Sequence, residues 1–135
     1  MPGSYWIEAE RRLVFTRGWG VLTDDELLAH ARTLRADSRF DRSYGQIVDF
    51  RELSKVEVTS DGIILLARQN PFPPEARRAV VVSTDLVFGM TRMFQGHMEA
   101  TSEQFGIFRE IEPAYEWVGL DRATPWPDRP PDASF

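Results

Sequence analysis

The sequence contains no cysteine. Disulfide bonds, thiolate metal sites and a cysteine nucleophile are therefore excluded. Histidine is also scarce, since only His30 and His97 are present, and a metal site would need carboxylates from distant segments. We expect the protein to bind neither a metal ion nor a cofactor.

Long hydrophobic runs are missing too. The longest apolar run covers residues 63–67, far short of the roughly 20 residues that cross a bilayer. The N-terminus lacks the basic start and apolar block of a signal peptide. The net charge is −5 and the basic residues are scattered, which argues against a nucleic-acid partner. We expect a cytoplasmic protein with no membrane span and no nucleic acid bound.

Sequence motifs of catalysis are absent as well. There is no glycine-rich phosphate loop, no serine elbow and no histidine–glutamate zinc motif. Asp49 with Glu52 is a candidate pair for acid–base chemistry, but an aspartate at the end of a strand usually bonds the nearby backbone. We therefore expect no catalytic residues and do not expect an enzyme.

The residues that are present predict one α/β domain. The chain has 135 residues, of which 42% are hydrophobic, enough for a single core. Apolar and polar residues alternate over 5–17, which predicts an N-terminal β-hairpin with its turn near Glu10 and Arg11, ended by Gly18 and Gly20. Thr23 followed by Glu26 forms a capping-box pattern that opens a helix.

Further strands and helices alternate along the rest of the chain. We predict strands in 45–50, 77–83 and 104–109, and helices in 59–70, 85–99 and 112–120. The order β-β-α-β-α-β-α-β-α predicts a mixed, mostly parallel sheet of about five strands with about four helices. Residues 121–135 hold four prolines and predict an extended C-terminal tail after a domain over 1–120, with Trp126 as the residue that could dock it.

Four stretches of the sequence resemble a known superfamily: "GVLTDDEL", "IVDF", "AVVVSTDLVFGMTRMF" and "FGIFREIEPAYEWV". Over residues 5–120 the chain resembles the SpoIIAA-like superfamily of STAS domains, in particular the small stand-alone bacterial proteins described as STAS/SEC14 domains. The resemblance implies a SpoIIAA-like fold and a non-catalytic regulatory or protein-interaction role. CRAL-TRIO domains, which are close to this fold, hold lipids.

The resemblance also implies a candidate phosphorylation site. Anti-sigma factor antagonists of this superfamily carry a phosphorylatable serine that caps the helix following a strand that ends in aspartate. Here Asp49 ends that strand, and Thr59 and Ser60 lie near the corresponding place, although the Asp-Ser-Ser-Gly core is not reproduced. A purely structural interpretation is that Thr59 or Ser60 caps the helix.

The segment 85–99 predicts a helix with two different sides. At 100° per residue, a core side forms, with His97 inside it as a structural histidine. The members of this core side are Leu86, Val87, Met90, Met93 and Phe94. Gly89, Gly96 and Ala100 share a flank that would permit close approach of a backbone or a ligand.

Phe88 falls on the polar side of this helix, beside Arg92, Gln95 and Glu99. Three interpretations are open: the chain itself covers Phe88, a subunit or partner contacts it, or its exposure is incidental. We predict that a partner or ligand surface consists of Phe88, Gly89, Arg92, Met93, Gly96 and His97.

Three functional hypotheses follow from these patterns. The first is a non-catalytic regulatory or interaction domain, as a homodimer or with a protein partner. The second is a carrier or sensor of a small apolar or lipid-like ligand, held beside the methionine-rich helix. The third is a phosphoswitch that uses Thr59 or Ser60 with Asp49.

Overall fold

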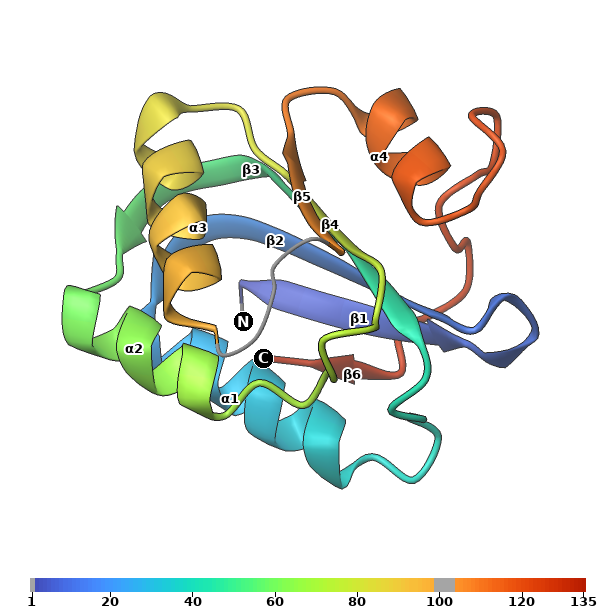
Figure 1. Ribbon diagram of the computed structural model, residues 1–135, viewed down its shortest axis with the longest axis horizontal. Helices are drawn as coiled ribbons and strands as arrows, with labels where there is room; N and C mark the ends of the chain where they lie inside the picture. Colours follow the sequence, from blue (N-terminus) through green and yellow to red (C-terminus); the bar gives the residue numbers. More distant parts are fainter. Residues whose placement is uncertain (1, 99–103) are drawn as a thin grey trace.

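The computed structural model describes residues 2–98 and 104–135. Its sheet has six strands in the order β5-β4-β3-β2-β1-β6 (Figure 1). In chain order the elements are β1 (Gly3–Glu8), a short 3-10 turn (Ala9–Arg11), β2 (Leu13–Thr23), α1 (Asp24–Ala36), β3 (Gly45–Glu57), α2 (Ser60–Arg68), β4 (Arg78–Val81), α3 (Asp85–His97), β5 (Phe105–Phe108), α4 (Ile111–Trp117) and β6 (Ala133–Ser134).

The N-terminal hairpin and the parallel strands confirm the predicted topology. β1 pairs antiparallel with β2, with Trp6 opposite Phe15. The register of β2, β3, β4 and β5 is parallel throughout, as crossover helices between successive strands require. Two predicted strand ends were wrong, because β2 continues past Gly20 and β3 continues past Phe50. These long strands curve over α1 and α2 (Figure 1).

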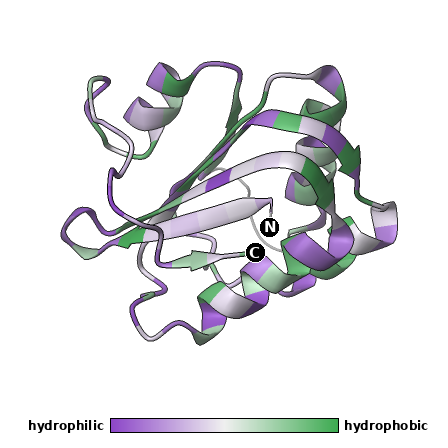
Figure 2. Ribbon diagram, turned by 180° about the vertical axis from the view of Figure 1, so that it is seen from behind, coloured by the Kyte–Doolittle hydropathy of each residue, from purple (hydrophilic) through white to green (hydrophobic). Residues whose placement is uncertain are grey.

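Side chains alternate between the two faces of the sheet, as the pleat dictates. Ala79 and Val81 on β4 pack under α4, whereas Val80 on β4 and Val82 just after it pack under α2 and α3. Each helix carries hydrophobic segments next to hydrophilic ones (Figure 2), as expected of helices that bury one side. None of the helices in the described ranges is long and apolar enough to cross a membrane.

The C-terminal segment packs against the hairpin and adds a strand that the sequence did not predict. β6 pairs antiparallel with β1. The Asp132 carboxylate accepts a hydrogen bond from the Ile7 backbone N–H at 2.7 Å, and the Trp6 indole N–H donates to the Arg129 carbonyl at 2.8 Å. The Trp126 ring packs edge-on against Phe15, with centroids 5.1 Å apart. Residues 121–135 are therefore held along their length by the domain.

The side of α3 that faces the core differs from the prediction. Leu86 and Met93 were placed in the core, yet they are 60% and 40% exposed. Val87 and Phe94 are buried as predicted, and Phe88, expected among polar residues, packs against the same cluster. The helix is turned by roughly a quarter turn from the predicted orientation. Apolar residues surround most of this helix, so the sequence did not determine which arc meets the sheet.

Candidate functional site

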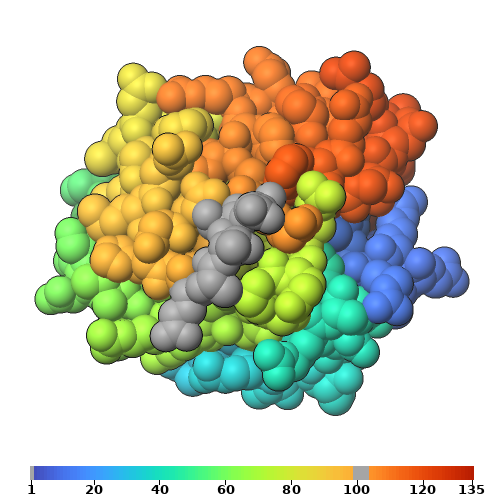
Figure 3. Space-filling model, viewed as in Figure 1, coloured from blue at the N-terminus to red at the C-terminus, as the bar shows by residue number. Residues whose placement is uncertain are grey.

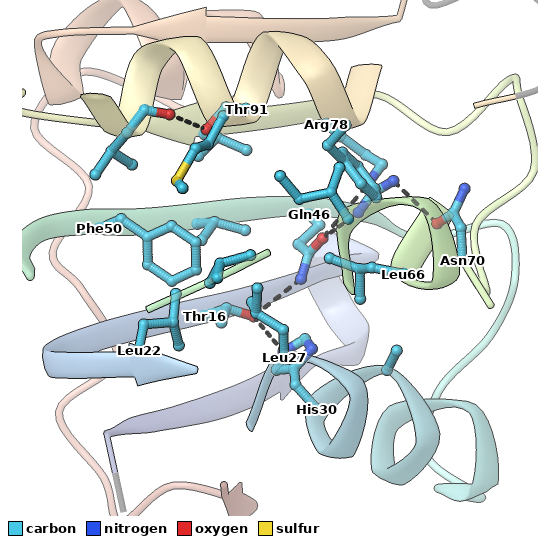
Figure 4. Close-up of a pocket in the computed structure, with 18 of the residues that line it drawn as sticks. Thr16, Leu22, Leu27, His30, Gln46, Phe50, Leu66, Asn70, Arg78 and Thr91 are labelled. Atoms are coloured by element: carbon cyan, nitrogen blue, oxygen red, sulfur yellow. Dashed lines mark hydrogen bonds between the residues drawn. The ribbon is translucent and has the colours of Figure 1, made fainter. Parts of the chain in front are cut away.

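A cavity lies between the sheet and the three helices α1, α2 and α3 (Figure 4). Its volume is about 120 Å³ and most of its wall is aliphatic or aromatic. Representative apolar residues of the wall are Leu22, Leu27, Phe50, Leu53, Ile63 and Leu66. A void of this kind is lined by side chains that lack contacts on one side.

Polar side chains form one part of the wall, and the register of the strands explains why they meet. Gln46 on β3 lies directly opposite Arg78 on β4, and Thr16 on β2 lies two residues beyond the partner of Gln46. Side chains two residues apart on a strand share a face. All three therefore point to the helical side, where His30 on α1 and Asn70 after α2 meet them (Figure 4).

Hydrogen bonds join these five residues into a continuous chain. Arg78 donates to Asn70 Oδ1 at 3.0 Å and, through Nη2, to Gln46 Oε1 at 3.0 Å. Gln46 Nε2 donates to Thr16 Oγ1 at 3.0 Å. Thr16 Oγ1 lies 3.1 Å from His30 Nε2, and the tautomer of the imidazole decides which of the two donates. The chain fixes the orientation of these five polar side chains.

The charge states of His30 and Arg78 follow from their surroundings. Burial, with a smaller contribution from the charge of Arg78, lowers the pKa of His30 from 6.5 to about 3. Burial also lowers the pKa of Arg78 from 12.5 to about 9. At neutral pH the imidazole is therefore uncharged and the guanidinium is charged. Arg78 is the only formally charged side chain among the described residues that line the cavity.

The comparisons with known proteins bear on the fold. The sequence matches no model of a known protein family and no curated protein. The structure is similar to the crystal structure of an uncharacterized protein of the DUF3478 family, with a SpoIIAA-like fold, from Shewanella loihica PV-4. The TM-score is 0.59, the identity is 16%, and the match covers 87% of this chain and 94% of the other. The chain has a SpoIIAA-like fold. The resemblance seen in the sequence is thereby confirmed at the level of fold.

The six residues predicted as a partner or ligand surface do not gather at the cavity of this SpoIIAA-like domain. Gly89, Arg92, Met93, Gly96 and His97 lie on the solvent-exposed side of α3. A side chain added at either glycine would meet open space, so the expected close approach is absent among the described residues. Ala100 and Glu99, which entered that prediction, lie outside the described residues.

Phe88 and His97 have exchanged their expected environments. Phe88 is half-buried, and the Arg109 guanidinium lies over its ring, 4.9 Å from the centroid. His97, predicted inside the core arc, is exposed and borders an outer groove between α2 and α3. The interpretation of His97 as a core histidine was wrong, for the same reason that the orientation of α3 was wrong. Of the three interpretations of Phe88, coverage by the protein's own chain fits these contacts.

Thr59 acts as the N-cap of α2. Its hydroxyl accepts a hydrogen bond from the Gly62 N–H at 3.0 Å and donates to the Asp24 carboxylate. Asp24 also accepts from the Thr59 backbone N–H at 2.8 Å. The capping interpretation is therefore confirmed for Thr59. A phosphate at this position would meet the negative charge of Asp24.

Asp49 is not positioned to act with Thr59 or Ser60. It lies in the middle of β3 and faces the α4 side of the sheet, where both of its oxygens accept from the Arg51 guanidinium at 2.9 Å. Burial raises the pKa of Asp49, but the hydrogen bonds and charge of Arg51 outweigh it and hold the pKa below its ordinary value. The rest of β3, which continues to Glu57, lies along the chain between Asp49 and the two hydroxyls.

The polar wall of the cavity was not predicted from the sequence. His30 was given no role from the sequence, whereas it is half-buried and lines the cavity. A signal for Gln46 and Arg78 was present, since each is a polar residue directly before a short apolar run, Ile47-Val48 and Ala79-Val80-Val81-Val82. Across the described residues, no group of three or more histidine, aspartate and glutamate side chains could hold a metal ion.

Proposed function

We propose that the protein is a non-catalytic domain that binds a small apolar molecule in the cavity, as a carrier or sensor. The observation that carries this proposal is the cavity itself, about 120 Å³ between sheet and helices. An engineered apolar cavity of about 150 Å³ in another protein stays dry and binds benzene. The ligand is therefore of the size of one small ring or a short alkyl chain.

The polar wall supports binding rather than catalysis. Thr16 and His30 lie at the distance of a nucleophile and its base. However, the Thr16 hydroxyl already accepts from Gln46. In catalytic sets of this type a third group orients the base, and the described part of the cavity wall contains no carboxylate that could do so. A few placed polar groups in an otherwise apolar wall are typical of ligand sites.

Filling the cavity tests the proposal. Ala31 is buried and lines the cavity, so Ala31→Leu should occupy part of the space. We expect wild type to be stabilised by short-chain alcohols and acids in thermal-shift and NMR titrations, and Ala31→Leu to lose most of this response. Ala36→Leu is the matched control, because Ala36 lies on the same helix but is exposed. An equal response in all three proteins, or no response in wild type, would overturn the proposal.

A second candidate is self-association through the exposed side of α3. Leu86 and Met93 are the large apolar side chains there, and Gly89 and Gly96 near them leave open space. α2 and α3 lie side by side on this surface (Figure 3). A homodimer that buries this surface should show twice the monomer mass by light scattering and dissociate in Met93→Glu. Arg32→Glu on α1 is the control, because Arg32 is exposed but lies on another helix, and a wild-type monomer at high concentration removes this candidate.

A further inference from the structure

The Arg78 side chain is enclosed by aromatic rings at one end of the cavity. Its guanidinium carbon lies 4.3 Å from the ring centroid of Phe72, 5.4 Å from that of Phe105 and 5.7 Å from that of Phe94. These rings hold the planar group in place and reduce its contact with water. Placing a charge in such surroundings costs free energy unless a counter-charge is supplied.

No counter-charge for Arg78 is found among the described residues. The guanidinium donates to the amide oxygens of Gln46 and Asn70 and, at 3.7 Å, to the Met98 sulfur, all of them uncharged. By contrast, five arginines with more exposed heads each have a carboxylate partner, and these are Arg39, Arg51, Arg109, Arg122 and Arg129. Arg78 thus combines a position enclosed by aromatic rings with contacts that, among the described residues, are all made to uncharged groups.

The remaining hydrogen-bonding capacity of Arg78 suits an anion. A guanidinium has five N–H groups, and the contacts above use four of them, one only weakly through sulfur. Nη2 retains an N–H beyond the one that Gln46 accepts. A carboxylate oxygen can accept this remaining N–H and supplies one negative charge for the guanidinium. A phosphate would bring up to two negative charges against a single positive one.

We infer that the cavity ligand is a small apolar carboxylic acid, with its carboxylate bound to Arg78 and its hydrocarbon part among the aliphatic side chains. The inference rests on the proposed function, since it names the class of molecule that the cavity takes. Gln46 and Asn70 act as positioning residues, because their amide oxygens accept hydrogen bonds from the guanidinium and hold it in the cavity wall (Figure 4). Uncharged His30 lets Arg78 remain the dominant charge of the site.

Two ligands of equal chain length separate this inference from the proposed function. Hexanoate and hexan-1-ol share a six-carbon chain and differ in the charged headgroup. A charge-assisted hydrogen bond is worth roughly 1.5–3 kcal/mol, so we expect wild type to bind hexanoate ~10- to 100-fold more tightly by NMR titration at pH 7. Equal affinities would overturn the inference and leave the proposed function standing. Binding of neither molecule would overturn both.

Adjacent arginines provide a matched pair of variants. Arg78→Met should bring the affinity for hexanoate down to that for hexan-1-ol and leave the affinity for the alcohol unchanged. Arg77→Met is the control, because Arg77 is exposed and stacks over Trp117 outside the cavity wall; it should keep the preference for the acid. Loss of that preference in Arg77→Met but not in Arg78→Met would contradict the assignment.

A readout on wild type avoids the question of whether Arg78→Met folds. The Nε–H resonance of Arg78 should shift on addition of hexanoate and stay in place on addition of hexan-1-ol. Hexyl phosphate should bind less tightly than hexanoate. An unmoved resonance at saturating hexanoate, or tighter binding of the phosphate, would show that Arg78 does not select a carboxylate.

Discussion

The two faces of the sheet are built differently. Under α4 and the C-terminal segment, aromatic rings fill the space: Trp126 packs edge-on against Phe15 and Trp6, with centroids 5.1 and 6.0 Å apart. Under α1, α2 and α3, a cavity remains and a charged side chain without a carboxylate partner among the described residues lines it. Both a void and an unpaired charge lower stability. The void and the unpaired charge lie together on one face, which is where we expect function to reside.

The face under α4 and the C-terminal segment is called the filled face below. Removing an aromatic ring from it should have the largest effect on the free energy of unfolding. Phe15 is fully buried and packs between the sheet and Trp126. Phe15→Ala leaves a hole that the surrounding strands cannot close, so we expect a loss of about 3–5 kcal/mol in the free energy of unfolding, measured with urea. Phe50→Ala removes a ring of the cavity wall and should lower the free energy of unfolding by less than Phe15→Ala does. A larger loss for Phe50→Ala would refute the view that the α4 face carries the better packed core.

Neighbouring valines on β4 compare the two faces more closely. Val81 is fully buried on the α4 face, and Val80 lines the cavity on the other. We expect Val81→Ala to lose roughly 2–3 kcal/mol, because contacts are removed on all sides, and Val80→Ala roughly 1–2 kcal/mol. Both substitutions replace valine by alanine on the same strand, so the effect of β propensity is the same in both and cancels in the comparison. Equal losses in urea unfolding would mean that the cavity is packed as densely as the opposite face.

Element order and strand pattern were predictable from the sequence, because alternation, capping residues and β-branched runs act locally. The capping box illustrates this: the Glu26 carboxylate accepts from the Thr23 N–H at 3.3 Å, as predicted. The sixth strand was not predictable, since two residues of β6 carry no pattern of their own. Its formation depends on the docking of Asp132 and Trp126, which are distant in sequence from the strand they contact.

The site was largely unpredictable for a related physical reason. Arg78, Gln46 and His30 come from three elements, and only the parallel register of β3 and β4 brings the first two together. On α3, apolar residues on most sides left its orientation open, so Met93 was expected inside and Phe88 outside. A single sequence records which residues are apolar, but not which arc of a helix the sheet will meet.

The pH dependence of stability should also differ between the faces. The folded pKa of His30 is about 3, below its ordinary value of 6.5, so between these values the unfolded chain binds more protons and stability falls as the pH falls. We expect a loss of about 2 kcal/mol between pH 6.5 and 5. His30→Gln should flatten the profile in this window, as followed by urea unfolding at each pH.

Asp49, on the filled face of the sheet, is the control for the pH range from 6.5 to 5. The pKa of its carboxyl is held below the ordinary value of 3.8, so its contribution is present above that value and is lost only as the pH falls further. Asp49→Asn should therefore leave the slope between pH 6.5 and 5 as in wild type. If Asp49→Asn flattens this window and His30→Gln does not, the assignment of the pH response to the cavity face is wrong.

The smallest expected effect concerns the two tryptophans of the filled face. The Trp126 indole nitrogen is buried and has no hydrogen-bond partner in the described parts of the chain, whereas the Trp6 indole donates to the Arg129 carbonyl at 2.8 Å. An unsatisfied buried donor already costs about 1–3 kcal/mol, which its removal recovers. Trp126→Phe should therefore lower the free energy of unfolding by less than about 1 kcal/mol, because the lost ring area is offset. Trp6→Phe should lower the free energy of unfolding by more, since it leaves the Arg129 carbonyl without its hydrogen-bond donor. A reversed order in urea unfolding would show that even the filled face leaves room for a partner of the Trp126 nitrogen, such as a bound water.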